Sequence, residues 1–154
     1  MRFKDAVILL SFFFLSFFSS AQIVVDDVGD GWKSKVDSAL FMIESAGPEY
    51  YEEVARNCKR ISYWMGDFST SVDSSVVIST HDMKLGSVCN IACAIVHEAH
   101  HMEIRRLGLK MRECEEEMEC YVRESRFVET TECPEAWLIG FIYKSIVAYQ
   151  EKCE

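Results

Sequence analysis

The chain has 154 residues, of which 49% are hydrophobic and 27% charged, and its formal net charge is −9. A chain of this length can bury one hydrophobic core, which is typical of a single domain. The acidity argues against a nucleic-acid partner, because nucleic-acid binding needs a basic surface.

The first 21 residues have the order of features of a secretory signal peptide. A charged start precedes an apolar run at 6–18, and the small residues Ser19, Ser20 and Ala21 offer a cleavage site. The apolar run is short for a bilayer span, so we expect cleavage rather than an uncleaved anchor. This predicts a signal peptide at 1–21, one domain at 22–154, a secreted or periplasmic location, and no stable membrane insertion after cleavage.

All the cysteines lie in the predicted mature part of the chain: Cys58, Cys89, Cys93, Cys114, Cys120, Cys133 and Cys153. In an exported protein, disulfides are expected. Because seven is an odd number, at least one thiol must be free or paired with another molecule. Cys89 and Cys93 are four apart on a predicted helix, a poor geometry for pairing with each other. We expect each to point elsewhere or to pack as a small apolar group.

The spacing of apolar residues predicts helices over 32–45 and 48–65, which are separated by the helix-breaking pair Gly47-Pro48. Two β-leaning runs follow, at 68–72 and 76–80, and predict a hairpin. Helical spacing returns at about 87–107, at 110–129 and from Pro134 onward. The predicted fold class is therefore α+β, predominantly α-helical, with one small β element.

The predicted helix at 87–107 carries His97-Glu98-Ala99-His100-His101, an H-E-x-x-H pattern. His97 and His101 are four residues apart, so both imidazoles project from one face and can reach one zinc ion at about 2.0–2.1 Å each. Glu98 points roughly 100° round the helix, so it is free to act on a water in the open position of the ion. We therefore predict that His97 and His101 are zinc ligands and that Glu98 is the general base. His100 is the unused position, expected to face solvent or the outer shell of the site.

A catalytic zinc site keeps three protein ligands and one open position, so another ligand must come from elsewhere. The predicted helix at 110–129 offers five glutamates: Glu113, Glu115, Glu116, Glu117 and Glu119. Here the sequence resembles the gluzincin-type zincin metallopeptidases, which carry H-E-x-x-H on one helix and a glutamate on the next, often as E-x-x-small. Glu117-Met118-Glu119-Cys120 fits that pattern. The resemblance implies that Glu117 is the third ligand, with Glu116 as the second choice.

The resemblance covers about residues 76–128 and implies a minimal zincin-like domain that hydrolyses peptides or proteins with zinc. It also implies an edge strand before the active-site helix, and residues 76–80 are placed to hold an extended substrate by strand addition. The chain departs from the family at Tyr121, where larger members often have an acidic or amide residue that orients a zinc histidine. We therefore expect the outer shell of the site to differ or to lie elsewhere.

Two other interpretations remain open. Cys93, His97 and His101 lie four apart along one side of the helix, and a further ligand would make a closed, structural metal site. The chain could also be a disulfide-stapled secreted binding protein in which the motif is vestigial. For hydrolysis, an oxyanion donor could come from Tyr143 or Tyr149, and His81 could reach the cleft, although a surface position is the better expectation for it.

Overall fold

The computed structural model describes residues 22–29 and 31–154, and the predicted signal peptide at 1–21 lies outside this range. The described residues form six helices and a four-stranded sheet, which confirms the predominantly α-helical α+β fold class. In chain order the elements are β1 (Val24–Val25), α1 (Trp32–Ala46), α2 (Pro48–Asn57), β2 (Arg60–Trp64), β3 (Thr70–Val72), β4 (Ser75–Ser79), α3 (Thr80–Leu85), α4 (Val88–Arg106), α5 (Glu113–Thr130) and α6 (Ala136–Cys153).

The sheet has the strand order β1-β2-β4-β3. The strands β1, β2 and β4 are parallel, whereas β3 runs antiparallel to β4. The predicted hairpin is therefore confirmed, and its turn places Asp73 at a positive φ of 52°. The expectation that residues 76–80 form an edge strand is wrong. The other side of β4 is occupied by β2, so the edge strand that contacts α4 is β3 instead.

The predicted helix at 48–65 is also wrong in its second half. The helix α2 ends at Asn57, Cys58 takes an extended conformation, and β2 begins at Arg60. Helical spacing continued by coincidence through Ile61, but that side chain is fully buried in the sheet, where it pairs with Val76. The short elements β1 and α3 were not predicted, because two residues and six residues give too little periodicity to recognise.

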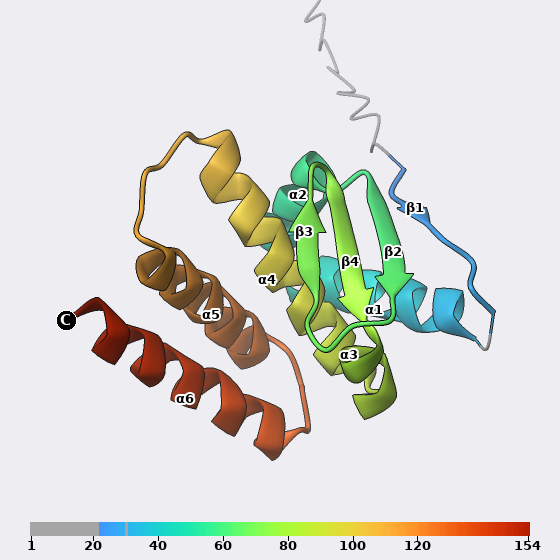
Figure 1. Cartoon of the computed structure of the whole chain (residues 1–154). Helices are drawn as coiled ribbons and strands as arrows, with labels where there is room; N and C mark the ends of the chain where they lie inside the picture. Colours follow the sequence, from blue (N-terminus) through green and yellow to red (C-terminus); the bar gives the residue numbers. More distant parts are fainter. Residues whose placement is uncertain (1–21, 30) are drawn as a thin grey trace, which may run out of the picture.

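The helix α4 is the centre of the molecule. It packs against α1 and α2, against β3 and β4 of the sheet, and against α5 on its other side (Figure 1). Its first half is apolar nearly all round and is buried as expected, with the side chains of Ile91 and Ile95 fully enclosed. The hydroxyl of Ser87 caps this helix by accepting a hydrogen bond from the backbone N–H of Asn90.

The two last helices, α5 and α6, pair closely and form one side of the molecule (Figure 1). The disulfide Cys89–Cys133 joins the start of α4 to the loop between them, and Cys114–Cys153 joins the start of α5 to the end of α6. The remaining thiols are free and buried: Cys58, Cys93 and Cys120. Cys89 and Cys93 thus behave as expected, one paired elsewhere and one packed as an apolar group. Across the described residues, no helix combines the length and apolarity needed to cross a membrane.

Candidate metal centre

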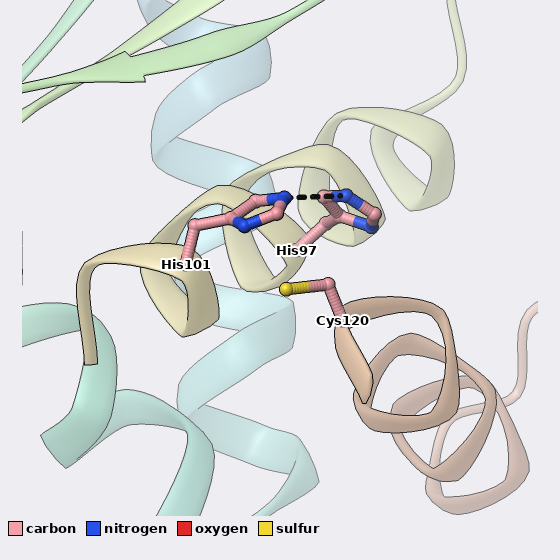
Figure 2. A group of neighbouring side chains, drawn as sticks. All are labelled: His97, His101 and Cys120. Atoms are coloured by element: carbon pink, nitrogen blue, oxygen red, sulfur yellow. Dashed lines mark hydrogen bonds between the residues drawn. The ribbon is translucent and has the colours of Figure 1, made fainter. Parts of the chain in front are cut away.

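The two histidines of the motif face each other from consecutive turns of α4. Their Nε2 atoms lie 3.2 Å apart, and Figure 2 shows both rings turned toward the same point. Both side chains are largely buried, because α5 covers this face of α4. The one-face geometry that the four-residue spacing predicts is thus present.

The carboxylate of Glu117 reaches the same point from α5. Its Oε2 atom lies 3.5 Å from Nε2 of His97, and its Oε1 atom lies 3.4 Å from Nε2 of His101. Ligand atoms held about 2.0–2.1 Å from a tetrahedral zinc ion are roughly 3.3–3.4 Å from one another. The separations in the structure are close to these values, although each oxygen of Glu117 approaches a different histidine.

Cys120 lies one turn after Glu117 and also faces the histidines (Figure 2). Its sulfur and one ring nitrogen of each histidine all lie within 4.8 Å of one another, so His97, His101 and Cys120 form a group that could hold a metal ion. The closed site considered from sequence used Cys93, and that thiol is not in this group. Cys120 is fully buried between the helices, which also fits the small residue that the E-x-x-small pattern places there.

The other ring nitrogens of the two histidines are bound to carboxylates of α5. Nδ1 of His97 lies 3.2 Å from Glu124, and Nδ1 of His101 lies 2.7 Å from Glu116. Histidines that bind metals through Nε2 commonly donate their Nδ1–H to a carboxylate, which fixes the tautomer and the ring orientation. Glu116, the second choice for a ligand, therefore lies on the outer side of His101.

Glu124 was missed in the sequence, although a signal for it exists. It follows Glu117 by seven residues, or two helical turns, so both carboxylates lie on one face of α5. Tyr121 does not bind His97 through its hydroxyl but packs its ring edge-on against the imidazole, with the ring centroids 4.6 Å apart. The carboxylate that binds this histidine belongs to Glu124, one turn further along α5.

His100 lies outside the cluster of His97, His101 and Glu117, and its side chain is 21% exposed. Its Nδ1 atom lies 2.8 Å from Glu53 of α2, and the other oxygen of Glu53 lies 2.8 Å from Arg123 of α5. This histidine therefore contributes to a polar link between α2, α4 and α5.

The electrostatics of the site favour charge on the histidines while no ion is bound. Burial lowers the pKa of His97, but hydrogen bonds to Glu117 and Glu124 outweigh it and raise the value to about 10. The same balance raises the pKa of His101, whereas hydrogen bonds to both rings hold the pKa of Glu117 well below its usual range. Burial raises the pKa of Glu98, although the two histidines oppose that rise. A bound cation would take over the role of the protons on the two rings.

A cavity of about 780 Å³ opens beside this cluster. The stripe of α4 that faces it consists of Asn90, Ala94, His97 and Glu98, and Glu117 lines it from α5. Glu98 therefore lines the same cavity as His97 and Glu117 but does not bind the histidines, and His101 lies behind this lining. Among the other candidates, Tyr149 and His81 line the cavity, whereas Tyr143 donates a hydrogen bond to Glu129.

Comparison of the chain with protein-family models, with curated proteins and with solved structures found no match.

Proposed function

We propose that this chain is an exported zinc-dependent metallopeptidase with His97, His101 and Glu117 as metal ligands and Glu98 as general base. The observation that carries the proposal is the meeting of two Nε2 atoms and one carboxylate, 3.2–3.5 Å apart, beside a cavity that His97 and Glu117 line. The two disulfides are compatible with an extracellular protein.

The residues divide the chemistry between them. When bound, a zinc ion supplies Lewis acidity, which polarises a carbonyl and lowers the pKa of a water. Glu98 is only 7% exposed and lines the same cavity, so its carboxylate can accept the proton of the attacking water and return it to the leaving amine. Glu116 and Glu124 keep the two imidazoles oriented with Nε2 toward the ion.

The proposal of a peptide substrate is based on the edge strand β3. It contacts α4 directly, and its outer side is the free edge of the sheet. An edge strand offers unpaired N–H and C=O groups to an extended peptide, which would then lie alongside the active-site helix. The side chain of Ser71, on β3, is fixed by a hydrogen bond from Arg105 of α4.

The test of this mechanism is the variant Glu98→Gln. A general base contributes about 10²–10⁴-fold, so peptide hydrolysis should fall by at least 100-fold while the zinc content is unchanged. The matched control is Glu119→Gln on α5, which removes an exposed carboxylate away from the cavity and should keep full activity. Full turnover in the Glu98→Gln variant would exclude this mechanism.

A closed structural site is the second candidate, because Cys120 belongs to the group that could hold a metal. A zinc-bound thiolate sulfur would lie roughly 3.5–3.6 Å from each ligand nitrogen. In a closed site, Cys120→Ala should release zinc and hydrolysis should be absent in the parent protein. In the three-ligand site that we propose, Cys120→Ala should retain both zinc and turnover. Cys58→Ala, which removes another buried free thiol, is the control for packing.

A further inference from the structure

We propose that the cavity beside the metal centre selects a substrate with a lysine or arginine two or three residues from the scissile bond. This inference rests on the proposed peptidase function and concerns the far end of the same cavity, away from the metal-binding point. It is carried by the charge of the lining, by its aromatic walls and by the distance between its two ends.

The lining is strongly acidic. Five carboxylates face the cavity, namely Asp67, Asp82, Glu98, Glu117 and Glu124, and none of the described residues that line it is a lysine or an arginine. A divalent ion would offset only two of these charges. The cavity therefore keeps a negative potential after the metal is bound, and such a potential attracts cations and repels acidic side chains.

Two of the carboxylates lie outside the metal centre. Asp82, at the start of α3, accepts hydrogen bonds from the hydroxyls of Ser69 and Ser79 and from the side-chain amide of Asn90. All three partners are neutral, so they fix the carboxylate in place without neutralising it. Asp67 is exposed on the loop between β2 and β3 and lines the same cavity, two residues before Ser69, which binds Asp82. These two groups are the anionic partners for a cation on the substrate.

The walls of the cavity are aromatic. Trp137 and Phe141 of α6 line one side and are 49% and 51% exposed, and Phe68, which is 80% exposed, lines the side formed by the loop between β2 and β3. Exposed rings next to carboxylates suit a long cationic side chain, because its alkyl stem packs on the rings while its charge lies over a ring face. A purely apolar substrate side chain would gain the first contact only.

The position of the basic residue follows from α4. Asn90, which binds Asp82, and His97, which binds the metal in our proposal, are seven residues apart on the stripe that faces the cavity. At 1.5 Å per residue, the acidic end lies about 10 Å along the helix from His97. An extended peptide advances about 3.3 Å per residue, so this distance corresponds to two or three residues of substrate.

Binding is tested in the Glu98→Gln variant loaded with zinc, which binds peptides without cutting them. Blocked alanine-based hexapeptides that carry one lysine, one norleucine or one glutamate at the same position are titrated by calorimetry. We expect the lysine peptide to bind about tenfold more tightly than the norleucine peptide, with the glutamate peptide weakest, and we expect the difference to shrink as salt increases. Equal binding of the lysine and norleucine peptides would overturn the proposal.

Further variants test which residues of the cavity give the preference for lysine. Asp67→Asn should reduce the advantage of lysine over norleucine by about two- to fivefold, the size expected for a partly exposed ion pair. Trp137→Leu should reduce it by a similar factor. Asp73→Asn changes another exposed carboxylate, which lies on the β3–β4 turn and does not line the cavity, and should change nothing. An unchanged lysine advantage in Asp67→Asn would overturn the assignment of this end of the cavity.

The two proposals fail in different ways. If the wild-type protein cuts peptides without regard to the position of lysine or arginine, the selectivity is wrong and the peptidase function stands. If the lysine peptide binds selectively but no peptide is cut, the cavity assignment stands and the peptidase function is wrong. Cleavage two or three residues from the basic residue, mapped by mass spectrometry of the products, supports both.

Discussion

The molecule consists of two regions that are held together in different ways. The platform, residues 31–106, supplies most of the hydrophobic core, in which Trp32, Val36, Ile43 and Ile78 are essentially inaccessible to solvent. The second region, the helical hairpin formed by α5 and α6 and called the hairpin from here on, is more exposed to solvent than the platform. Its last helix buries only two side chains and leaves large apolar ones half-exposed. One disulfide joins the hairpin to the platform, and the other joins its two helices.

The candidate site lies at the interface between these two regions. The platform supplies both imidazoles and Glu98, whereas the hairpin supplies Glu117 and the carboxylates that orient the imidazoles. A metal ion would therefore join the platform to the hairpin. We infer that metal binding and docking of the hairpin stabilise each other.

The largest expected effect comes from comparing two tryptophans. Trp32 is 1% exposed in the platform core and packs near Tyr63, so Trp32→Ala should lower the free energy of unfolding by about 3–5 kcal/mol. Trp137→Ala, in the hairpin, should change it by less than about 0.5 kcal/mol, because that ring is half-exposed. Urea unfolding of the metal-free variants measures both. Equal losses would show that the hairpin is packed as firmly as the platform.

The disulfides are expected to differ in a second property. Each closes a loop of about the same length, with separations of 44 and 39 residues, so removing either should cost about 3–4 kcal/mol of stability in a chain-entropy treatment. Only Cys89–Cys133 joins the platform to the hairpin. The double variant Cys89→Ala and Cys133→Ala should therefore also weaken zinc binding, measured by chelator competition. Removal of Cys114–Cys153 should weaken zinc binding less. The reverse order would contradict a metal site that lies between the platform and the hairpin.

The carboxylates of the hairpin should tune the histidines of the platform. Glu124→Gln keeps the shape of the side chain but weakens its bond to Nδ1 of His97, and losses of about 10–100-fold in metal affinity are typical of such changes. Glu116→Gln should have a smaller effect, because Glu116 is more exposed than Glu124. Glu113→Gln, an exposed carboxylate at the start of the same helix, is the control. Unchanged affinity in Glu124→Gln would mean that the orientation of His97 is set by packing alone.

The same contrast explains what could be predicted from the sequence. Long helices were recognised to within a few residues because many turns repeat the same pattern, as in α4 and α5. The strand β2 was missed because Val54, Cys58 and Ile61 continue the helical spacing past the end of α2 at Asn57. Which strand occupies the edge could not be derived, because β2 pairs with β4 through contacts between distant parts of the chain.

For the candidate site, the sequence predicted the geometry within one helix better than the packing of one helix against another. The facing of His97 and His101 follows from four-residue spacing, and the structure brings both near Glu117. The spacing of seven residues places Glu124 on the same face of α5 as Glu117, but which histidine it binds depends on how α5 packs against α4. The same is true of Cys120, which replaces Cys93 in the group that could hold a metal.

The smallest predicted effect concerns a polar contact within the platform. Glu103 of α4 accepts hydrogen bonds from Arg106, Asn57 and Arg56, which together lower its pKa to about 2. Because the folded-state pKa lies below the ordinary value, the unfolded chain takes up the proton first as the pH falls. The stabilisation is therefore complete above about pH 5 and is lost between pH 5 and pH 2.

Glu103→Gln should lower the free energy of unfolding by about 1 kcal/mol at pH 7, a small value because the arginine partners are half-exposed and screened by solvent. The difference from wild type should shrink toward zero as the pH approaches 2. Urea unfolding with a chelator present, at pH 7, 4 and 3, measures it without any contribution from bound metal. A difference that stays constant over this range would mean that the contact acts through packing and not through charge. In that case the charge of Glu103 would contribute nothing to the contact between α2 and α4.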